Sequence, residues 1–248
     1  MTTLTTTKLS NNSSEKKVAV IITAAGSSVR MGGTKKEFLP LNDGTVLSNC
    51  AVAFLKAFPN LTNLVITIPE GMNEQAEQAL NSSKDFLLLK SAALSLNLTF
   101  ITGSKTRQSS IFNALDFLHN LPSQPEYVLI HDGARPFVTP EIILQTAQAA
   151  IDFGAAAPGF TPTDTIKQIN QDGFITAHLE RKSLICIQTP QAFKFATLYD
   201  AHVTASKEQT EYTDDTEIWG KFVGSVKITN GDPSNIKITY PSDLEKLK

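Results

Sequence analysis

Residues 18–41, VAVIITAAGSSVRMGGTKKEFLPL, join an apolar strand to a group of cations. Residues 18–24 form an apolar run of strand length, and small residues continue to Ser28. Arg30, Lys35 and Lys36 then follow within a short span. A backbone without bulky side chains, followed by positive charge, is the pattern that binds a polyphosphate. We therefore interpret this stretch as a strand that leads into a phosphate-binding loop.

Apolar runs of strand length alternate with segments of helical period along the next part of the chain. We expect strands at 64–69, 97–103, 127–133 and 155–160, and helices at 46–58, 73–83, 107–120 and 139–154. Thr139 as N-cap, with Pro140 and Glu141 after it, predicts where the last of these helices begins. Strands that are apolar on both faces and alternate with helices predict an α/β fold, a Rossmann-like and mostly parallel sheet with helices on both faces.

The pattern changes near residue 161. Residues 164–193 alternate in polarity around a turn at Gln171, Asp172 and Gly173, which predicts a long β-hairpin that projects from the sheet as an arm at about 163–190. After the arm we expect further helical segments and a closing stretch, VGSVKITNGDPSNIKIT, before a short terminal helix from about Ser242. We divide the chain into a disordered N-terminal tail, 1–17, which is rich in Thr, Ser and Asn, and a single domain, 18–248.

The first loop lies where an open parallel sheet binds its ligands, beyond the carboxyl end of a strand. Small side chains from Ala24 through Ser28 let backbone N–H groups approach phosphate oxygens, and Arg30 and Lys36 supply charge. The alternative is a tight strand-to-helix turn whose cations lie in solvent. Lys35 by itself is expected to be a solvated neighbour.

A second candidate site follows the strand at 127–133, in the sequence HDGARPF. Asp132 ends a buried strand, and we predict that it holds Mg²⁺ against the phosphates. The alternative for Asp132 is an aspartate of a turn or N-cap. His131 is expected to be a packed histidine. For Arg135, a structural ion pair is as good an interpretation as a role in the site.

Composition excludes several classes of function. The chain of 248 residues has a formal charge of −2, so it offers no basic footprint for nucleic acid. Cys50 and Cys186 lie in apolar patterns without metal-ligand spacing, and we expect both to pack in the core of a protein of the reducing cytosol. No run reaches the roughly 18 apolar residues of a membrane span, which favours a cytoplasmic protein.

Seven motifs occur in order along the chain: AAGSSVRMGGTKKEFLPL, TRQSSI, HDGARPFV, TDTIK, QTPQAF, YTDD and NIKIT. Together they resemble the 2-C-methyl-D-erythritol 4-phosphate cytidylyltransferases of the non-mevalonate isoprenoid pathway. The resemblance covers nearly all of the chain after residue 17. It implies an enzyme that uses CTP and Mg²⁺, attaches CMP to methylerythritol phosphate, releases pyrophosphate, and works as a homodimer whose arms embrace the partner.

The resemblance also assigns residues. The nucleotide-binding set that it implies is Ala24, Ala25, Gly26, Ser27, Ser28, Ser104, Ser110, Asp132 and Gly133. Arg30, Lys36 and Lys237 match the catalytic cations, and Asp132 matches the acid near Mg²⁺. The positions that match those holding methylerythritol phosphate are Thr165, Arg181, Thr189 and Lys237.

Some residues differ from the family pattern. Ser28 and Ser104 stand where the family usually has glycine, and Gly133 stands where it usually has alanine. The spacing from Arg30 to Lys36 is one residue shorter than expected, although KEFL aligns Lys36 with the family lysine. Two other functions stay open from the sequence: a ribitol 5-phosphate cytidylyltransferase, and a non-catalytic nucleotide-binding dimer module.

Overall fold

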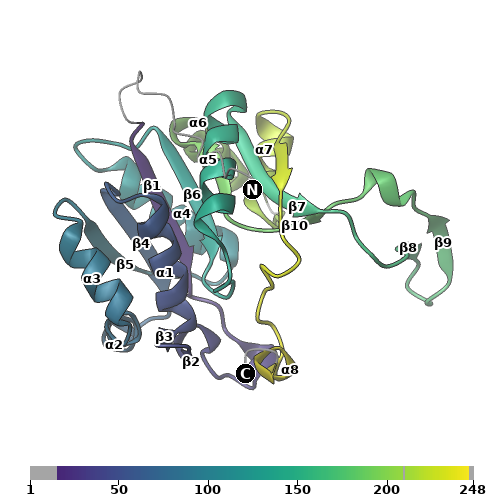
Figure 1. Cartoon of the computed structure of the whole chain (residues 1–248). Helices are drawn as coiled ribbons and strands as arrows, with labels where there is room; N and C mark the ends of the chain where they lie inside the picture. The colour runs from purple at the N-terminus through teal and green to yellow at the C-terminus, as the bar shows by residue number, and fades with distance from the viewer. Residues whose placement is uncertain (1–15, 209, 246–248) are drawn as a thin grey trace, which may run out of the picture.

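A computed structural model describes residues 16–208 and 210–245, and its centre is a twisted, mostly parallel sheet (Figure 1). Four parallel strands lie side by side in the order β5, β4, β1, β6. Strand β11 pairs antiparallel with β6 and β7, and β7 also pairs with β10 and, in parallel, with β12. Their bounds are β1 Val18–Thr23, β4 Asn63–Ile68, β5 Asn97–Thr102, β6 Tyr127–Asp132, β7 Ala155–Phe160, β10 Cys186–Ile187, β11 Gln191–Lys194 and β12 Lys227–Asn230.

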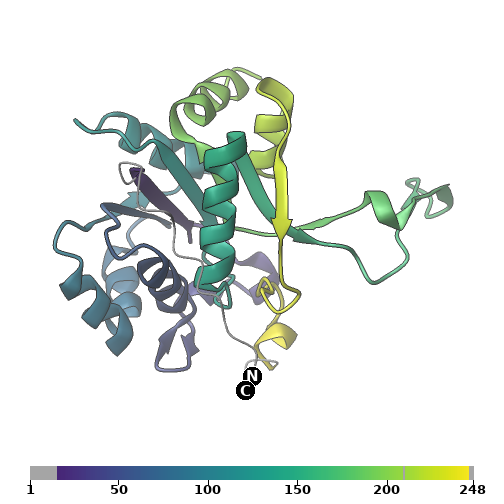
Figure 2. The same cartoon turned by 45° about the horizontal axis from the view of Figure 1, so that its top comes forward.

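Helices cover both faces of this sheet, as the sequence predicts (Figures 1 and 2). Alternate side chains of β1 point to opposite faces: Val20 and Ile22 pack against α1, α3 and α5, whereas Ala19 and Ile21 pack against α4, α6 and α7. The helices are α1 Val46–Ala57, α2 Asn73–Asn81, α3 Lys84–Ala92, α4 Arg107–His119, α5 Pro140–Phe153, α6 Phe195–Ala205, α7 Asp215–Phe222 and α8 Pro241–Glu245. None of the helices in the described residues is long and apolar enough to cross a membrane.

All five predicted strands and all four predicted helices form. One helix was missed: Ser83 accepts a hydrogen bond from the N–H of Phe86 and starts α3 where the preceding helix was expected to end. The sequence of α3 lacks a clear helical pattern of apolar and polar residues, because the apolar Leu88 lies on the exposed side of the helix.

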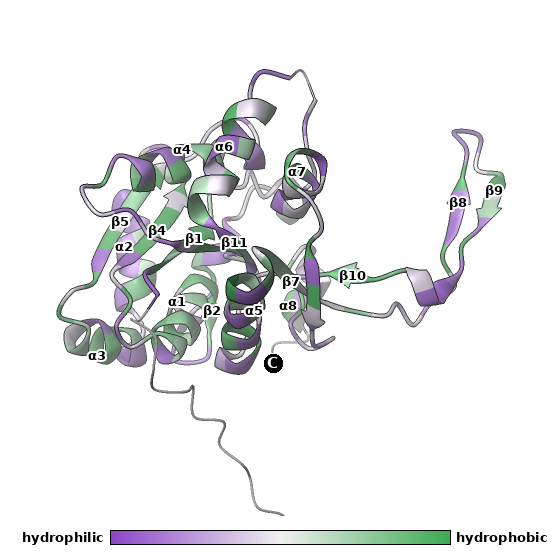
Figure 3. Cartoon of the chain, turned by 90° about the horizontal axis from the view of Figure 1, so that it is seen from above, coloured by the Kyte–Doolittle hydropathy of each residue, from purple (hydrophilic) through white to green (hydrophobic). Residues whose placement is uncertain are grey.

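The predicted arm is present and projects far from the sheet (Figures 1 and 3). It carries β8 (Lys167–Ile169), β9 (Ile175–His178) and the 3₁₀ turn η3 (Arg181–Ser183). In the turn, the side chain of Asn170 accepts hydrogen bonds from the N–H groups of Asp172 and Phe174.

Two expectations for this region are corrected. Residues 191–193 belong to β11 of the central sheet and not to a hairpin, because Ala192 and Phe193 are fully buried between β6 and β7. Cys186 is only half-buried in the short edge strand β10, whereas Cys50 is fully buried as expected. The expected disordered tail lies mostly outside the described residues; Lys16 and Lys17, which are described, both contact Glu126.

After β12 the chain returns toward the first loop. Figure 2 shows this yellow segment descending to α8. Ile238 is fully buried beside Leu41 and Val46, and its N–H donates to the carbonyl of Ala134 at 2.8 Å. Short strands β2 (Pro40–Leu41) and β3 (Gly44–Thr45) complete this end of the molecule. Residues 237–239 are thereby fixed next to the carboxyl ends of the parallel strands.

Candidate active site

A cleft of about 410 Å³ opens at the carboxyl ends of the parallel strands. Most of the predicted site residues line it: Ala25, Gly26, Ser27, Ser28, Arg30, Lys36, Ser104, Ser110, Asp132 and Lys237. Sequence reasoning gave no role to several others that line it, among them Glu37, Lys105, Arg107, Glu211 and Thr239. The cleft therefore brings together segments from the whole length of the chain.

Five predicted site residues do not line this cleft. Ala24 and Gly133 are buried beneath it, where their N–H groups donate to the carbonyls of Thr67 and Thr23. Thr189 lies behind the end of β6. Thr165 and Arg181 lie on the arm, which projects away from the sheet (Figure 1), and there Nη2 of Arg181 donates to Oγ1 of Thr165 at 3.2 Å.

The first loop holds its shape by close backbone packing. A Cβ on Gly103 would lie 2.2 Å from Cβ of Ala25, so the loops after β1 and β5 touch at this glycine. Ser28 has φ 53°, the left-handed region that favours glycine, which is the residue the family usually has there. The Ser28 hydroxyl is buried and has no hydrogen-bond partner among the described residues.

The two neighbouring lysines have different surroundings. Nζ of Lys35 donates to the carbonyl of Gly26 at 2.9 Å, so Lys35 ties the loop together and is not the solvated neighbour expected from the sequence. Lys36 lines the cleft. Burial lowers the pKa of Lys36, and Lys237 and Arg30 lower it further, while Glu37 opposes them. Lys36 is thus the lysine that faces the other cations.

Glu37 is a buried acid that sequence reasoning missed. Its side chain lines the cleft, is only 3% exposed, and has one oxygen without a hydrogen-bond partner in the residues that the structure describes. Burial raises the pKa of Glu37. Nothing in the sequence distinguished this residue from an exposed glutamate between cations.

Asp132 lies among three cations. Its Oδ2 is 2.7 Å from Nζ of Lys237, and Nε of Arg107 and of Arg135 lie 3.6 and 3.7 Å from its two oxygens. Burial alone would raise the pKa of Asp132, but Lys237 and Arg107 outweigh it and hold that pKa well below its usual range. Asp132 is therefore an ionised carboxylate in a strongly positive site.

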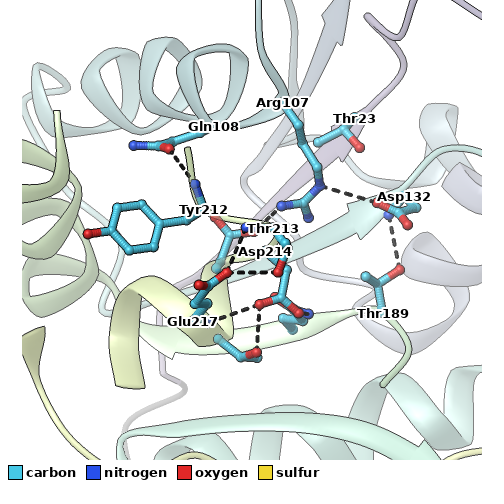
Figure 4. Close-up of polar contacts among 12 residues, drawn as sticks. Thr23, Arg107, Gln108, Asp132, Thr189, Tyr212, Thr213, Asp214 and Glu217 are labelled. Atoms are coloured by element: carbon cyan, nitrogen blue, oxygen red, sulfur yellow. Dashed lines mark hydrogen bonds and ion pairs between the residues drawn. The ribbon is translucent and has the colours of Figure 1, made fainter. Parts of the chain in front are cut away.

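Thr189, drawn beside Asp132 in Figure 4, links the end of β6 to His131. The N–H of Asp132 donates to Oγ1 of Thr189 at 3.0 Å, and that hydroxyl lies 3.0 Å from Nδ1 of His131. Nε2 of His131 is 3.1 Å from the carbonyl of Arg135 and must carry the proton, since a carbonyl only accepts. Burial lowers the pKa of His131 to about 4, which confirms the expected packed, neutral histidine.

Arg107 contacts Asp132 (Figure 4) and also a second buried acid, Asp215. Its Nη1 donates to Asp215 at 2.9 Å, and the other oxygen of Asp215 lies 3.0 Å from Nε2 of the buried His202. Burial opposes ionisation of Asp215, but Arg107 and His202 keep its pKa below the usual value. Arg107 and Asp215 stand in the motifs TRQSSI and YTDD, so the signal was present, although the sequence alone did not pair them.

Ser104 and Ser110 shape the start of α4. Oγ of Ser110 accepts from the N–H of Ser104 at 2.9 Å and donates to the carbonyl of Thr106 at 2.8 Å. The Thr106 side chain accepts a hydrogen bond from the N–H of Ser109, and the Ser109 side chain accepts one from the N–H of Thr106, which caps the N-terminus of α4. The positive end of α4 thereby faces the cleft.

A mostly parallel sheet, with small-residue loops and converging cations at its carboxyl ends, defines a nucleotide-binding α/β enzyme. The sequence model of the 2-C-methyl-D-erythritol 4-phosphate cytidylyltransferase (IspD) family matches residues 18–247. The chain belongs to this family.

Individual proteins that are similar to this chain carry the name of the same family. A 2-C-methyl-D-erythritol 4-phosphate cytidylyltransferase of Clostridium perfringens is 34% identical over 89% of this chain and 92% of its own length. The crystal structure of 4-diphosphocytidyl-2C-methyl-D-erythritol synthase from Anaerococcus prevotii superposes with a TM-score of 0.78 and 28% identity over 94% of both chains. The Thermus thermophilus cytidylyltransferase gives 0.70 with 26% identity, covering 93% of this chain and 96% of its own. The chain is a cytidylyltransferase of the methylerythritol phosphate pathway, and a ribitol 5-phosphate enzyme or a non-catalytic module is not favoured.

Proposed function

We propose that this cleft binds the triphosphate of CTP and transfers CMP to 2-C-methyl-D-erythritol 4-phosphate, forming 4-diphosphocytidyl-2-C-methyl-D-erythritol. The observation that carries the proposal is the convergence of Arg30, Lys36 and Lys237, from distant parts of the chain, on one cleft that also holds Asp132. Cations collected in this way repel one another unless an anion lies between them. A triphosphate supplies that charge.

The first loop offers backbone N–H groups from Ala25 through Ser28 to the phosphates. The start of α4, with Ser104 and Ser110, closes the other side and is suited to the base and ribose. Ala24 and Gly133 contribute to nucleotide binding by supporting the loop from beneath. These roles follow the family pattern and are consistent with the geometry.

Asp132 is suited to hold Mg²⁺ together with the phosphates. Mg²⁺ in nucleotide enzymes takes one or two carboxylates and completes its shell with phosphates and water. Oδ2 of Asp132 pairs with Lys237, whereas the nearest cation to Oδ1 is 3.6 Å away, so one oxygen is available. The described residues contain no cluster of three acidic, histidine or cysteine ligands, which agrees with a metal bound largely by substrate. When bound, Mg²⁺ neutralises charge on the phosphates.

The reaction requires no covalent group from the protein. A phosphate oxygen of methylerythritol phosphate attacks the α-phosphorus of CTP, the bond from that phosphorus to the bridging oxygen breaks, and pyrophosphate leaves with the electron pair. Arg30, Lys36 and Lys237 hold the two anions together and stabilise negative charge in the transition state. Arg107, held by Asp215, keeps Asp132 in place.

A second copy of the chain completes the site in this proposal. The arm exposes the apolar side chains Ile166, Ile169, Phe174, Ile175, Leu179 and Ile185, which a homodimer would cover. Figure 3 shows, in green, segments of the arm that consist of hydrophobic residues. Arg181 and Thr165 then reach the partner's cleft and bind methylerythritol phosphate. A contact of Thr189 with that substrate stays a prediction, as does the cytoplasmic location.

One experiment tests the reaction. Purified protein is incubated with CTP, Mg²⁺ and either methylerythritol phosphate or ribitol 5-phosphate, and pyrophosphate release is measured. We expect release with methylerythritol phosphate and strong dependence on Mg²⁺. Preference for ribitol 5-phosphate would overturn the substrate assignment, and no release with either would overturn catalysis.

A further inference from the structure

Arg30 and Tyr240 join the two segments at the mouth of the cleft. The guanidinium carbon of Arg30 lies 5.6 Å from the centre of the Tyr240 ring, within the range of a cation–π contact. Arg30 belongs to the turn η1 (Val29–Met31) after the first loop, and Tyr240 follows the segment that brings Lys237 and Thr239 to the cleft. The contact therefore links the phosphate-binding loop to the C-terminal segment.

Tyr240 is well anchored. Ile238, two residues earlier, is fully buried, and the N–H groups of Thr239 and Tyr240 both donate to Oδ2 of Asp243 at 2.9 Å. Tyr240 as a whole residue is 52% exposed and does not belong to the core. A fixed backbone thus presents a free aromatic face to Arg30.

Arg30 has the opposite character. It is exposed, and in the residues that the structure describes its side chain forms no ion pair with an acid. This matters because a carboxylate would orient Arg30 but would also compete with phosphate for it. An aromatic ring attracts the cation without neutralising its charge. The guanidinium is therefore held at the cleft with its charge available for an anion.

We propose that Tyr240 is a positioning residue for nucleotide binding, which holds Arg30 ready for the triphosphate. This inference rests on the proposed role of Arg30 in binding CTP. Without the ring, Arg30 must be ordered when CTP binds, so affinity falls. The expected loss is about two- to fivefold, the effect of a cation–π contact at an exposed site.

A double-mutant cycle on CTP binding tests this. The dissociation constant for CTP is measured by calorimetry for wild type, Tyr240→Phe, Tyr240→Leu, Arg30→Met and the Arg30→Met/Tyr240→Leu double variant. Tyr240→Phe keeps the ring and should match wild type, and Tyr240→Leu should bind about two- to fivefold more weakly. In the Arg30→Met background, Tyr240→Leu should have no further effect. Phe153→Leu is the matched control, since Phe153 has a similar contact with Lys227 elsewhere.

Three results would contradict the proposal. Tyr240→Leu could bind CTP as wild type does, which would mean that the ring does not position Arg30, or more tightly, which would mean that the ring holds Arg30 away from the nucleotide. The two substitutions could instead weaken binding additively, which would mean that Tyr240 acts independently of Arg30. If Arg30→Met alone leaves CTP affinity unchanged, the failure lies in the role of Arg30 itself. Melting temperatures of all variants separate loss of affinity from loss of fold.

Discussion

Nζ of Lys237 lies 2.7 Å from Oδ2 of Asp132. This pair joins the end of β6 to the C-terminal segment, which is also held by the buried Ile238 and by hydrogen bonds of Asn235 to Arg135 and Thr189. The same carboxylate also faces Arg107 and Arg135. Asp132 therefore has two functions in the proposed site, as an acid for Mg²⁺ and as the anion that keeps cations together before CTP binds.

Asp132→Asn separates these two functions. The substitution keeps the shape but leaves three cations without their anion, so we expect the free energy of unfolding to fall by about 3 kcal/mol. We also expect kcat to fall by about 10² to 10³ at a temperature where the variant is fully folded. Chemical denaturation and steady-state kinetics over a range of Mg²⁺ concentrations measure both. Full activity of the folded variant would restrict Asp132 to a structural role.

The two lysines of the first motif should behave differently. Lys36→Ala should lower kcat by about 10² to 10³ with little change in melting temperature, because a loop cation contributes little to stability. Lys35→Ala removes the hydrogen bond to Gly26 and should mainly raise KM for CTP, by less than about tenfold. Both variants are assayed under identical conditions. A larger loss of kcat in Lys35→Ala would reverse the assignment.

Gly103 is predicted to tolerate no side chain. In Gly103→Ala the new Cβ would lie 2.2 Å from Cβ of Ala25, so one of the two nucleotide loops must move. We expect a loss of about 1 to 3 kcal/mol in stability together with weaker CTP binding. Gly220→Ala in α7 is the control, since a Cβ there meets nothing within 4 Å and alanine favours the helix. Equal behaviour of the two variants would show that the loops are not tightly packed.

His131 predicts a pH dependence of stability. Its pKa is about 4 in the folded chain and 6.5 in the reference state, so the unfolded chain binds the extra proton first as pH falls. The neutral form stabilises the fold fully above pH 6.5, and on the order of 3 kcal/mol is lost as pH falls from 6.5 to 4. The measurement is the free energy of unfolding as a function of pH, with EDTA present to remove divalent metal. Between pH 6.5 and 4 this free energy should fall less steeply for His131→Gln than for wild type. Identical slopes for both proteins would contradict the prediction.

The fold was predictable because its signals are local. The strands that become β1, β4 and β6 contain continuous apolar runs, and the cap at Thr139 marks the start of α5. Residues 191–193 were assigned wrongly because a short apolar run fits a hairpin and an antiparallel sheet strand equally well. Only the burial of Phe193 against β6 distinguishes them.

The residues that line the cleft were predictable where family motifs carry them, and not where their contacts depend on pairing across the fold. Arg107 and Asp215 lie in different motifs, and only the packing of α4 near α7 brings them within 2.9 Å. Tyr240 lies in none of the seven motifs. Its contact with Arg30 depends on the path of the C-terminal segment past that residue. Sequence spacing contains no information about such contacts.

The arm leads to the last prediction, that each active site is shared between two subunits. Arg181 contacts Thr165 on the arm, which projects away from the sheet (Figure 1), and does not line the cleft of its own chain. If it binds methylerythritol phosphate in the partner's cleft, Arg181→Ala should raise KM for that substrate at least about tenfold, since a charged hydrogen-bonding group is lost. The affinity for CTP should not change.

Mixing variants tests whether the site is shared. At a methylerythritol phosphate concentration well below the raised KM, Arg181→Ala and Lys36→Ala each have low turnover in this proposal, but a heterodimer of the two has one composite site with both residues intact and one with neither. Turnover of the subunit-exchanged mixture should therefore exceed that of either parent, approaching about a quarter of wild type when exchange is random, because half of the dimers are mixed and each has one working site. A mixture of Lys36→Ala with Lys36→Arg is the control. Its subunits exchange in the same way, but no mixed dimer regains an intact Lys36. A mixture no more active than its parents, with exchange verified by differently tagged subunits, would show that Arg181 does not complete the partner's site.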